Sequence, residues 1–211
     1  RDVYAKKQLF MIINADKKET LQNEIKDRYK KFRRIFNDHF INRQSRYLIN
    51  ENRNETLEKK IKDKYTFEIK IPWGWELIKE KSDSSFIWIG REMPFQWISI
   101  SLIDENFLQD ELGVGRYLWQ WPKNNYDNIK FNEYKFDIDK TNYNGTFAWR
   151  ATGLWETISA IESKGGPFNS YIFYDSKTNK TYHINYLIHH PGGNKSIFMR
   201  QMDIIVKTFR S

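Results

Sequence analysis

The sequence contains no cysteine among its 211 residues, so disulfide bonds and thiolate metal sites are excluded. It has no run of about 18 apolar residues, which is the length that a helix needs to cross a bilayer. No segment repeats at a period of about 20 to 50 residues, and no tract has low complexity. The missing cysteines do not fix the compartment, because oxidising and reducing environments both tolerate their absence.

A recognisable signal peptide is also missing from the start of the chain. The sequence opens with RDVYAKKQLFMIINA, which resembles the interior of a domain, so we expect the C-terminal portion of a longer protein. Its length is sufficient to bury a core. With 17% aromatic and 29% charged residues, the composition is that of a folded protein. We therefore expect residues 1–211 to form a single α+β domain.

The formal net charge is +8, and many of the basic residues lie between positions 17 and 64. Acidic residues are interspersed with them throughout that segment. Mixed signs at helical spacing are typical of a solvated helix face. A net positive charge permits nucleic-acid binding without demonstrating it, and we expect no nucleic-acid partner.

The first part of the chain predicts a strand and then helices. Residues 8–15 contain five contiguous apolar residues, as in a strand that is buried on both faces. Asp16 and Glu19 match a capping box, which predicts a helix start. Apolar residues then recur every three or four positions up to about residue 47, and Asn54 predicts the cap of a second, shorter helix. The helical segment is thus 17–65, and its stripe is formed by Leu21, Ile25, Tyr29, Phe32, Phe36 and Phe40.

From residue 66 the apolar period changes to two, which favours strands. Residues 66–190 are therefore expected to be mainly β, followed by a C-terminal helix at 195–209. The predicted fold is an antiparallel sheet of about six to eight strands, packed against the long helix and the C-terminal helix. The strands are expected at 66–71, around 77–78, and at 86–89, 97–103, 129–138, 146–155, 168–174 and 181–188.

The segment between the expected strands at 97–103 and 129–138 is less regular. Residues 104–114 favour a short helix that ends at Gly113. The aromatic run at 117–121 is expected to stop at Pro122, and 123–128 to form a loop.

The two strands within residues 145–175 are expected to be joined by a tight turn at Gly165-Gly166-Pro167. Proline restricts the residue before it, so Gly165 is the candidate for a positive φ angle.

Candidate catalytic residues are few. An enzymatic site would need a pocket that gathers His183 or His189 with Glu133 or Asp137. The sequence shows no nucleophile elbow and no zinc signature. We therefore expect no catalytic activity, no metal and no cofactor.

Eight tryptophans are the most distinctive residues. The pairs Trp73/Trp75 and Trp119/Trp121 have a spacing of two, which would place each pair on one strand face. Such a face could form a flat platform on which sugars stack. Packing in the core is the alternative role for these side chains.

Three motifs resemble the C-terminal signature of the domain of unknown function 4837 family. They are Gly153-Leu154-Trp155-Glu156, Gly165-Gly166-Pro167-Phe168 and Met199-Arg200-Gln201-Met202. Residues 1–5 with Gln8, and the strand at 86–89 with Arg91, resemble further parts of the family's chain. We expect the signature residues to be structural.

The resemblance implies a place in the cell envelope, since members of the family look like envelope lipoproteins of Bacteroidetes. It implies an outer-membrane lipoprotein with a soluble periplasmic or surface domain. Membrane contact would then come only through an upstream lipid anchor that is absent from this chain. The leading hypothesis is a non-catalytic domain that binds an envelope protein partner. The alternative is a glycan- or peptidoglycan-binding module that uses a tryptophan platform.

Overall fold

The computed structural model describes residues 8–211 except 160 and 162, and the chain divides into two compact units, Arg1–Tyr47 and Leu48–Ser211. In the first unit, an extended segment leads into helix α1, Lys18–Ser45. The bounds of α1 confirm the predicted long helix, although none of its residues is buried. A π-helical turn, Arg46–Asn50, follows.

Two predictions for the first unit are wrong. Residues 8–15 form no strand, because they pair with no other strand in the described part of the chain, and a strand requires such a partner. The capping box does not form either. The helix cap is Lys17, without a side-chain hydrogen bond, so Asp16 lies one position too early to reach the first turn.

The second unit begins with helix α2, Glu55–Lys64. Its predicted cap is confirmed, since the Asn54 side chain accepts a hydrogen bond from the Leu57 amide at 3.0 Å. The amide nitrogen of the Asn54 side chain also donates to the carbonyl of Trp75 at 2.9 Å. One residue therefore both starts the helix and attaches it to the segment that enters the sheet.

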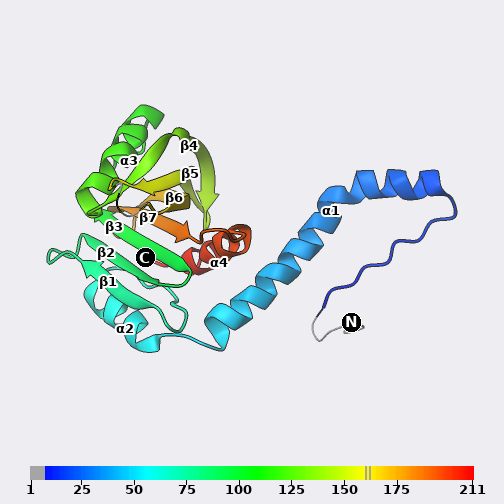
Figure 1. Ribbon diagram of the computed structural model, residues 1–211, viewed down its shortest axis with the longest axis horizontal. Helices are drawn as coiled ribbons and strands as arrows, with labels where there is room; N and C mark the ends of the chain where they lie inside the picture. Colours follow the sequence, from blue (N-terminus) through cyan, green and yellow to red (C-terminus); the bar gives the residue numbers. More distant parts are fainter. Residues whose placement is uncertain (1–7, 160, 162) are drawn as a thin grey trace. The chain divides into compact units, whose positions relative to one another are not determined.

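A seven-stranded antiparallel sheet forms the centre of this unit, which confirms the α+β fold (Figure 1). Strands β1–β3 form one meander and β4–β7 a second, and the order across the sheet is β1-β2-β3-β7-β6-β5-β4. The last strand in the chain thus pairs with the third, at the centre of the sheet. The strands are β1 Glu76–Glu80, β2 Phe86–Arg91, β3 Phe95–Ile103, β4 Ile129–Tyr143, β5 Thr146–Thr157, β6 Gly165–Asp175 and β7 Lys180–His189.

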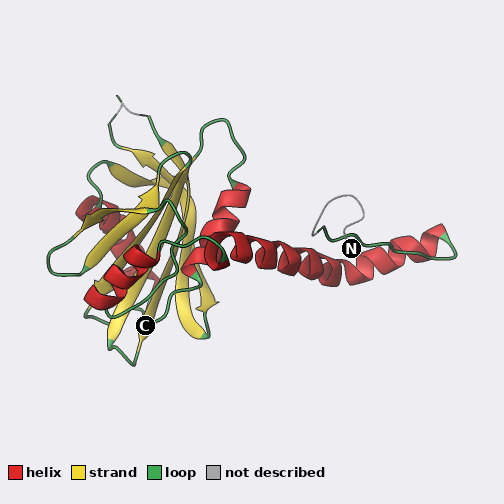
Figure 2. Cartoon of the chain, turned by 90° about the horizontal axis from the view of Figure 1, so that it is seen from below, coloured by secondary structure: helices red, strands yellow, loops and turns green. Residues whose placement is uncertain are grey.

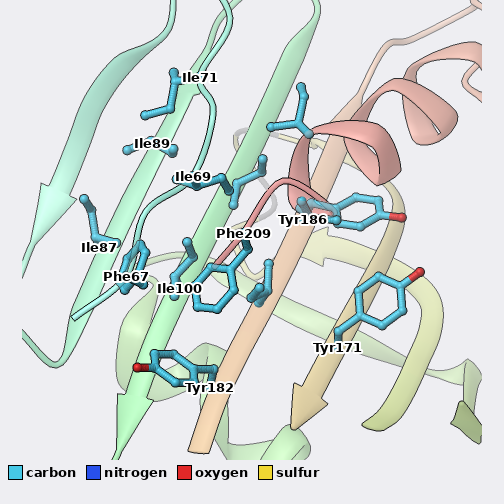
Figure 3. Packing of buried hydrophobic residues seen from close by; sticks show 14 of the residues in the cluster. Phe67, Ile69, Ile71, Ile87, Ile89, Ile100, Tyr171, Tyr182, Tyr186 and Phe209 are labelled. Atoms are coloured by element: carbon cyan, nitrogen blue, oxygen red, sulfur yellow. The ribbon is translucent and has the colours of Figure 1, made fainter. Parts of the chain in front are cut away.

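One face of the sheet is covered by α2, by the segment after it and by the C-terminal helix α4, Ser196–Val206. The segment at 66–71 has the predicted alternation of burial, because Phe67, Ile69 and Ile71 are all buried. It is not a sheet strand, however, and makes only isolated bridges such as Glu68 to Arg210. It lies across the sheet face, where its apolar side chains contact those of the strands and of Phe209 (Figure 3).

The opposite face is covered by helix α3, Glu111–Asn125, so that helices flank the sheet on both sides (Figure 2). The predicted short helix ending at Gly113 is wrong. Asp110 caps α3 by accepting a hydrogen bond from the Gly113 amide, so the helix starts where it was expected to end. The predicted stop at Pro122 is also wrong, since that residue lies in the last turn and Val114, Leu118 and Trp121 supply a helical apolar stripe.

The predicted turn at Gly165-Gly166-Pro167 is wrong as well. These residues begin β6, and neither glycine has a positive φ angle. The two glycine-containing signatures pair with each other across β5 and β6, from Gly153 with Phe168 to Glu156 with Gly165.

Steric constraints explain these glycines. A Cβ atom on Gly166 would lie 1.9 Å from the carbonyl oxygen of Ile188 on β7. A Cβ atom on Gly153 would lie 2.0 Å from the carbonyl oxygen of Lys135, within a bulge of β4. The signature therefore permits close approach of the backbones of β5 to β4 and of β6 to β7, across four neighbouring strands.

The Trp155 side chain fills the space above Gly166. It is 1% exposed, and its indole N–H donates to the Ile188 carbonyl at 3.2 Å. We expect Trp155→Ala to lower the free energy of unfolding by about 3–5 kcal/mol, because it leaves a cavity and an unpaired carbonyl. Denaturant unfolding measures this loss. Trp119→Ala is the control, since Trp119 is 49% exposed, and should cost about 1 kcal/mol or less.

Glycine to alanine changes should have opposite signs at two positions. Gly166→Ala should destabilise by about 1–3 kcal/mol, since the added methyl group meets the backbone of β7. Gly115→Ala should instead stabilise by about 0.5–1 kcal/mol, because Gly115 lies inside α3 and its nearest contact would be 3.6 Å away. Thermal unfolding of both variants tests the pair. Equal effects at the two sites would contradict the steric explanation.

Candidate functional site

The two tryptophan pairs do not form the predicted platform. Trp73 is 75% exposed, whereas Trp75 is 1% exposed in the core. Similarly, Trp119 is 49% exposed and Trp121 is buried. The first pair lies in a turn and the second on α3, where residues two apart point to nearly opposite sides. The rule for strands therefore applies to neither pair.

Trp73 instead borders a hollow at one end of the first meander. The hollow has a volume of about 570 Å³, which is in the range of ligand pockets. It is bordered by the turn before β1, by β1 and β2, by the β2–β3 turn and by the start of β3. We call it the tryptophan hollow. Its lining residues are Trp73, Gly74, Glu76, Leu77, Ile78, Trp88, Gly90, Arg91, Glu92, Met93 and Trp97.

Two indoles form the inner part of the tryptophan hollow. Gly90 and Trp97 face each other in the β2–β3 ladder, and a Cβ atom on Gly90 would lie 2.5 Å from the Trp97 ring. The glycine thus allows the indole to lie over β2. Trp88 packs edge-on against Trp97, with 5.5 Å between ring centroids, and Trp97 also contacts Trp155 at 5.7 Å. These two indoles form the inner wall of the hollow, which is therefore continuous with the core around the signature residue Trp155.

The rim of the hollow is apolar and exposed. Met93 is 89% exposed, Trp73 is 75% exposed and Ile78 is 44% exposed. Two backbone positions with positive φ present these side chains, Gly74 at +77° and Met93 itself at +62°. Because Met93 is not glycine, its left-handed conformation is unfavourable in isolation. The β2–β3 turn therefore holds a large apolar side chain in water.

Charges of both signs border the same hollow. Glu76 and Glu92 supply carboxylates, and the Nε of Arg91 donates to the Gln96 side chain at 2.6 Å. The indole N–H of Trp88 is buried and has no hydrogen-bond partner among the described residues. The hollow thus combines aromatic surface with an acidic and a basic edge, which could orient a polar ligand or a peptide.

Trp88, Trp97 and Met93 were not predicted as site residues, because tryptophans in strands were expected to pack in the core. A signal was present nonetheless. In β2 and β3 these tryptophans alternate with Ile87, Ile89 and Ile98, so they had to face away from the isoleucine core. The alternation does not predict that this part of the sheet face is left uncovered and borders a hollow.

A second cluster of polar side chains lies beneath α3. Tyr126 is at its centre, where its hydroxyl bonds the Ser99 hydroxyl at 2.8 Å and accepts from the Asn185 amide at 2.9 Å. The indole N–H of Trp121 donates to Ser101 at 2.8 Å. Burial raises the pKa of Tyr126 well above its ordinary value. A hollow of about 230 Å³ reaches this cluster beside Ser101 and Trp121.

His183 belongs to this buried cluster. It is 0% exposed on β7, and its Nδ1 atom is 3.0 Å from the Tyr117 hydroxyl, while its Nε2 atom has no partner among the described residues. Burial lowers the pKa of His183 to about 3, so the imidazole is neutral near pH 7.

The residues of the enzymatic hypothesis are not gathered in one pocket. Glu133 and Asp137 are exposed on β4, and two strands separate β4 from the β7 strand of His183. The Nδ1 atom of His189 lies 2.8 Å from the Gly165 carbonyl oxygen and 3.2 Å from the Gly165 amide nitrogen, so it braces the signature. Among the described residues, no cluster of three or more histidine or acidic side chains could hold a metal ion.

The remaining signature residues are spread over the fold. On β5, Leu154 is 42% exposed, and Glu156 forms an ion pair with Lys130 at 3.1 Å. On β6, Pro167 pairs with Leu154 in the β5–β6 ladder. On α4, Arg200 is exposed whereas Gln201 is 8% exposed. Phe168 stacks on Phe131 with 4.0 Å between ring centroids. The signature therefore does not form one surface site.

A match to a protein family covers most of the chain. A family model described as a domain of unknown function (DUF4837) matches residues 54–208. The chain belongs to the DUF4837 family. The match starts at the cap of α2 and ends just after α4, so it lies within the second unit. The resemblance proposed for residues 1–5 and Gln8 lies outside the matched range, and residues 1–7 lie outside the described residues.

Some solved structures match this chain at low identity. The Ran-binding protein Mog1p of Saccharomyces cerevisiae has 10% identity and a TM-score of 0.43, over 68% of this chain and 89% of its own. LpqN of Mycobacterium tuberculosis, described as involved in cell envelope biogenesis, has 13% identity and a TM-score of 0.40, over 68% and 82%. No curated protein matches. Likeness at this level carries no argument about function.

No helix in the described residues is both long and apolar enough to cross a membrane. Helix α1 has 28 residues but is too rich in charged residues for that role.

The burial of His183 predicts a pH dependence of stability. In the unfolded chain this histidine binds a proton below about pH 6.5, whereas the folded chain resists protonation down to about pH 3. Stability should therefore fall as the pH falls through this window, by about 2 kcal/mol between pH 6.5 and 5. Denaturant unfolding at several pH values measures the slope.

His183→Gln should remove this part of the slope whatever its effect on stability at pH 7. Identical slopes for His183→Gln and the unmodified chain would show that the imidazole is not held neutral.

Proposed function

We propose that this protein is a non-catalytic domain of the cell envelope that binds a protein partner through the tryptophan hollow. One observation carries the proposal, namely an aromatic hollow surrounded by exposed apolar side chains. Trp73 and Met93 leave most of their surface in water beside an inner wall made by Trp88 and Trp97. Exposed apolar surface next to a cavity is typical of sites that bind other proteins or ligands.

The composition of the hollow fits a protein partner. Tryptophan, methionine and arginine are enriched in protein interfaces, and tryptophan and arginine dominate their binding energy. A partner's apolar side chain would enter between Trp73 and Met93 and pack on Trp97. Arg91 and Glu92, adjacent in the chain, would fix its orientation through charges of opposite sign.

The envelope location is supported by the family resemblance alone. Members of the family look like lipoproteins, so we propose that this protein is an outer-membrane lipoprotein. The domain would then be displayed in the periplasm or at the cell surface. A partner within the same envelope would be held close to it, which raises the effective concentration of a weak binding site.

A glycan ligand is the second candidate. It is favoured by the exposed indole of Trp73, which lies near the carboxylates of Glu76 and Glu92 in the same hollow. Sugar rings stack on indoles, and carboxylates accept hydrogen bonds from sugar hydroxyls. A peptidoglycan fragment could therefore bind at one exposed indole, without the predicted pair.

Substitutions on the rim test the site. Trp73→Ala and Met93→Ala should each weaken partner binding at least about tenfold, because each removes apolar contact area. Both should leave the unfolding free energy within about 0.5 kcal/mol, since the side chains are mostly exposed. Trp119→Ala is the matched control, as an exposed tryptophan on α3 that does not line the hollow.

The measurement is affinity capture from native membranes in mild detergent, with the recovered partner quantified for each variant. Tryptophan fluorescence titration with soluble peptidoglycan fragments is run in parallel. A stoichiometric protein that is lost with Trp73→Ala supports the main proposal, whereas a fluorescence response lost with Trp73→Ala supports the glycan. A lone monomer without a fluorescence response would contradict both.

A further inference from the structure

Helix α1 carries an apolar arc that nothing else in the described part of the first unit covers. Leu21, Ile25, Tyr29, Phe32 and Phe36 recur at intervals of four and three, which places them along one side of the helix. None of them is buried, and Tyr29, Phe36 and Ile25 are 57%, 47% and 40% exposed. The preceding segment adds Ile12, which is 70% exposed. Three of the five arc residues are aromatic.

The charges of α1 are arranged around this arc. The helix contains eight lysine and arginine residues but only four aspartate and glutamate residues. Lys26, Lys30 and Arg33 each follow an arc residue by one position, so they form a basic row beside the arc. By the same geometry, Asp27 and Asp38 lie on the far side of the helix together with Arg34, and Glu19 lies in line with the basic row.

We propose that α1 lies along the surface of an anionic lipid bilayer, with its apolar arc in the headgroup region. An interfacial helix of this kind has aromatic and aliphatic residues on one face and lysine or arginine on its polar side. The basic row would lie among the lipid phosphates, while Asp27 and Asp38 would face water. Each cation near such a surface contributes attraction that weakens with salt.

A bilayer fits these observations better than the other partners that a basic helix can bind. Duplex nucleic acid would be bound mainly through the cations, and that mode leaves the aromatic arc unexplained. A second copy of the chain would carry the same net positive charge on its α1, so that like charges would repel across the contact. An anionic bilayer complements both the arc and the charge. This contact is separate from the tryptophan hollow and does not depend on the proposed function.

The test uses the 211-residue chain, produced without lipid modification. It is sedimented with phosphatidylcholine vesicles, and with vesicles in which about one-third of the lipid is phosphatidylglycerol. We expect binding to the anionic vesicles that decreases with salt, and weaker binding to the neutral ones. Absence of binding to the anionic vesicles would overturn the proposal.

Two sets of variants separate the arc from the charges. Replacing Ile25, Tyr29 and Phe36 together by alanine should lower partition into anionic vesicles about tenfold or more. Alanine favours the helix, so this loss cannot come from unfolding of α1. Ile41→Ala is the matched control, since Ile41 is 36% exposed but lies outside the arc, and it should change binding by less than about twofold.

Replacing Lys26, Lys30 and Arg33 by glutamine should lower binding to anionic vesicles by about fivefold for each cation, with little change on neutral vesicles. If the arc variant binds as well as the unmodified chain and duplex DNA competes with the vesicles, the surface binds polyanions and the proposal is wrong. It is equally wrong if the chain is a dimer without lipid and the arc variant is a monomer.

Discussion

The ladder between β3 and β7 is the constraint on which the second unit depends. It consists of nine residue pairs, from Phe95 with His189 to Ile103 with Thr181. This ladder joins the two meanders into one sheet. Forming it closes a long loop that contains α3 and three strands, at an entropic cost that grows only slowly with loop length. Once it forms, both faces of the sheet extend across all seven strands, and each can be covered by helices.

The same ladder places the parts of the tryptophan hollow. Trp97 faces Leu187 on β7, and Phe168 on β6 faces that same leucine. As a result, the ring centroid of Trp97 in the first meander lies 5.7 Å from that of Trp155 in the second. The inner wall of the hollow is therefore supported by the signature core, although the two segments are far apart in the sequence.

Much of this fold could be predicted from local patterns. Apolar alternation and runs of apolar, aromatic and β-branched residues indicated the seven sheet strands, and the interval of three to four indicated α1, α2 and α4, because each pattern reflects the local burial of one element. The failures required information from elsewhere in the chain. The alternation at Phe67, Ile69 and Ile71 reports burial, and nothing local says that the segment crosses the sheet rather than joining it. From the sequence alone, Gly166 is predicted to be a turn residue. The structure shows that it is a glycine because the carbonyl of Ile188, on β7, lies against it.

The candidate site was predicted only in part for the same reason. The spacing of Trp73 and Trp75 suggested a shared face, but a residue with positive φ between them turns the chain and sends one indole to water and the other to the core.

Trp97 shows how the inner wall and the rim of the hollow differ. Its ring is held over Gly90 and between Phe95, Trp88 and Trp155, so it loses little freedom when a ligand arrives. Trp73 and Met93 are held only by their turns and must be ordered on binding, at about 0.5–1.5 kcal/mol for each side chain. Affinity at the hollow then depends on the rigid wall offsetting the ordering of the rim, and a partner that contacts both gains more than one that contacts the rim alone.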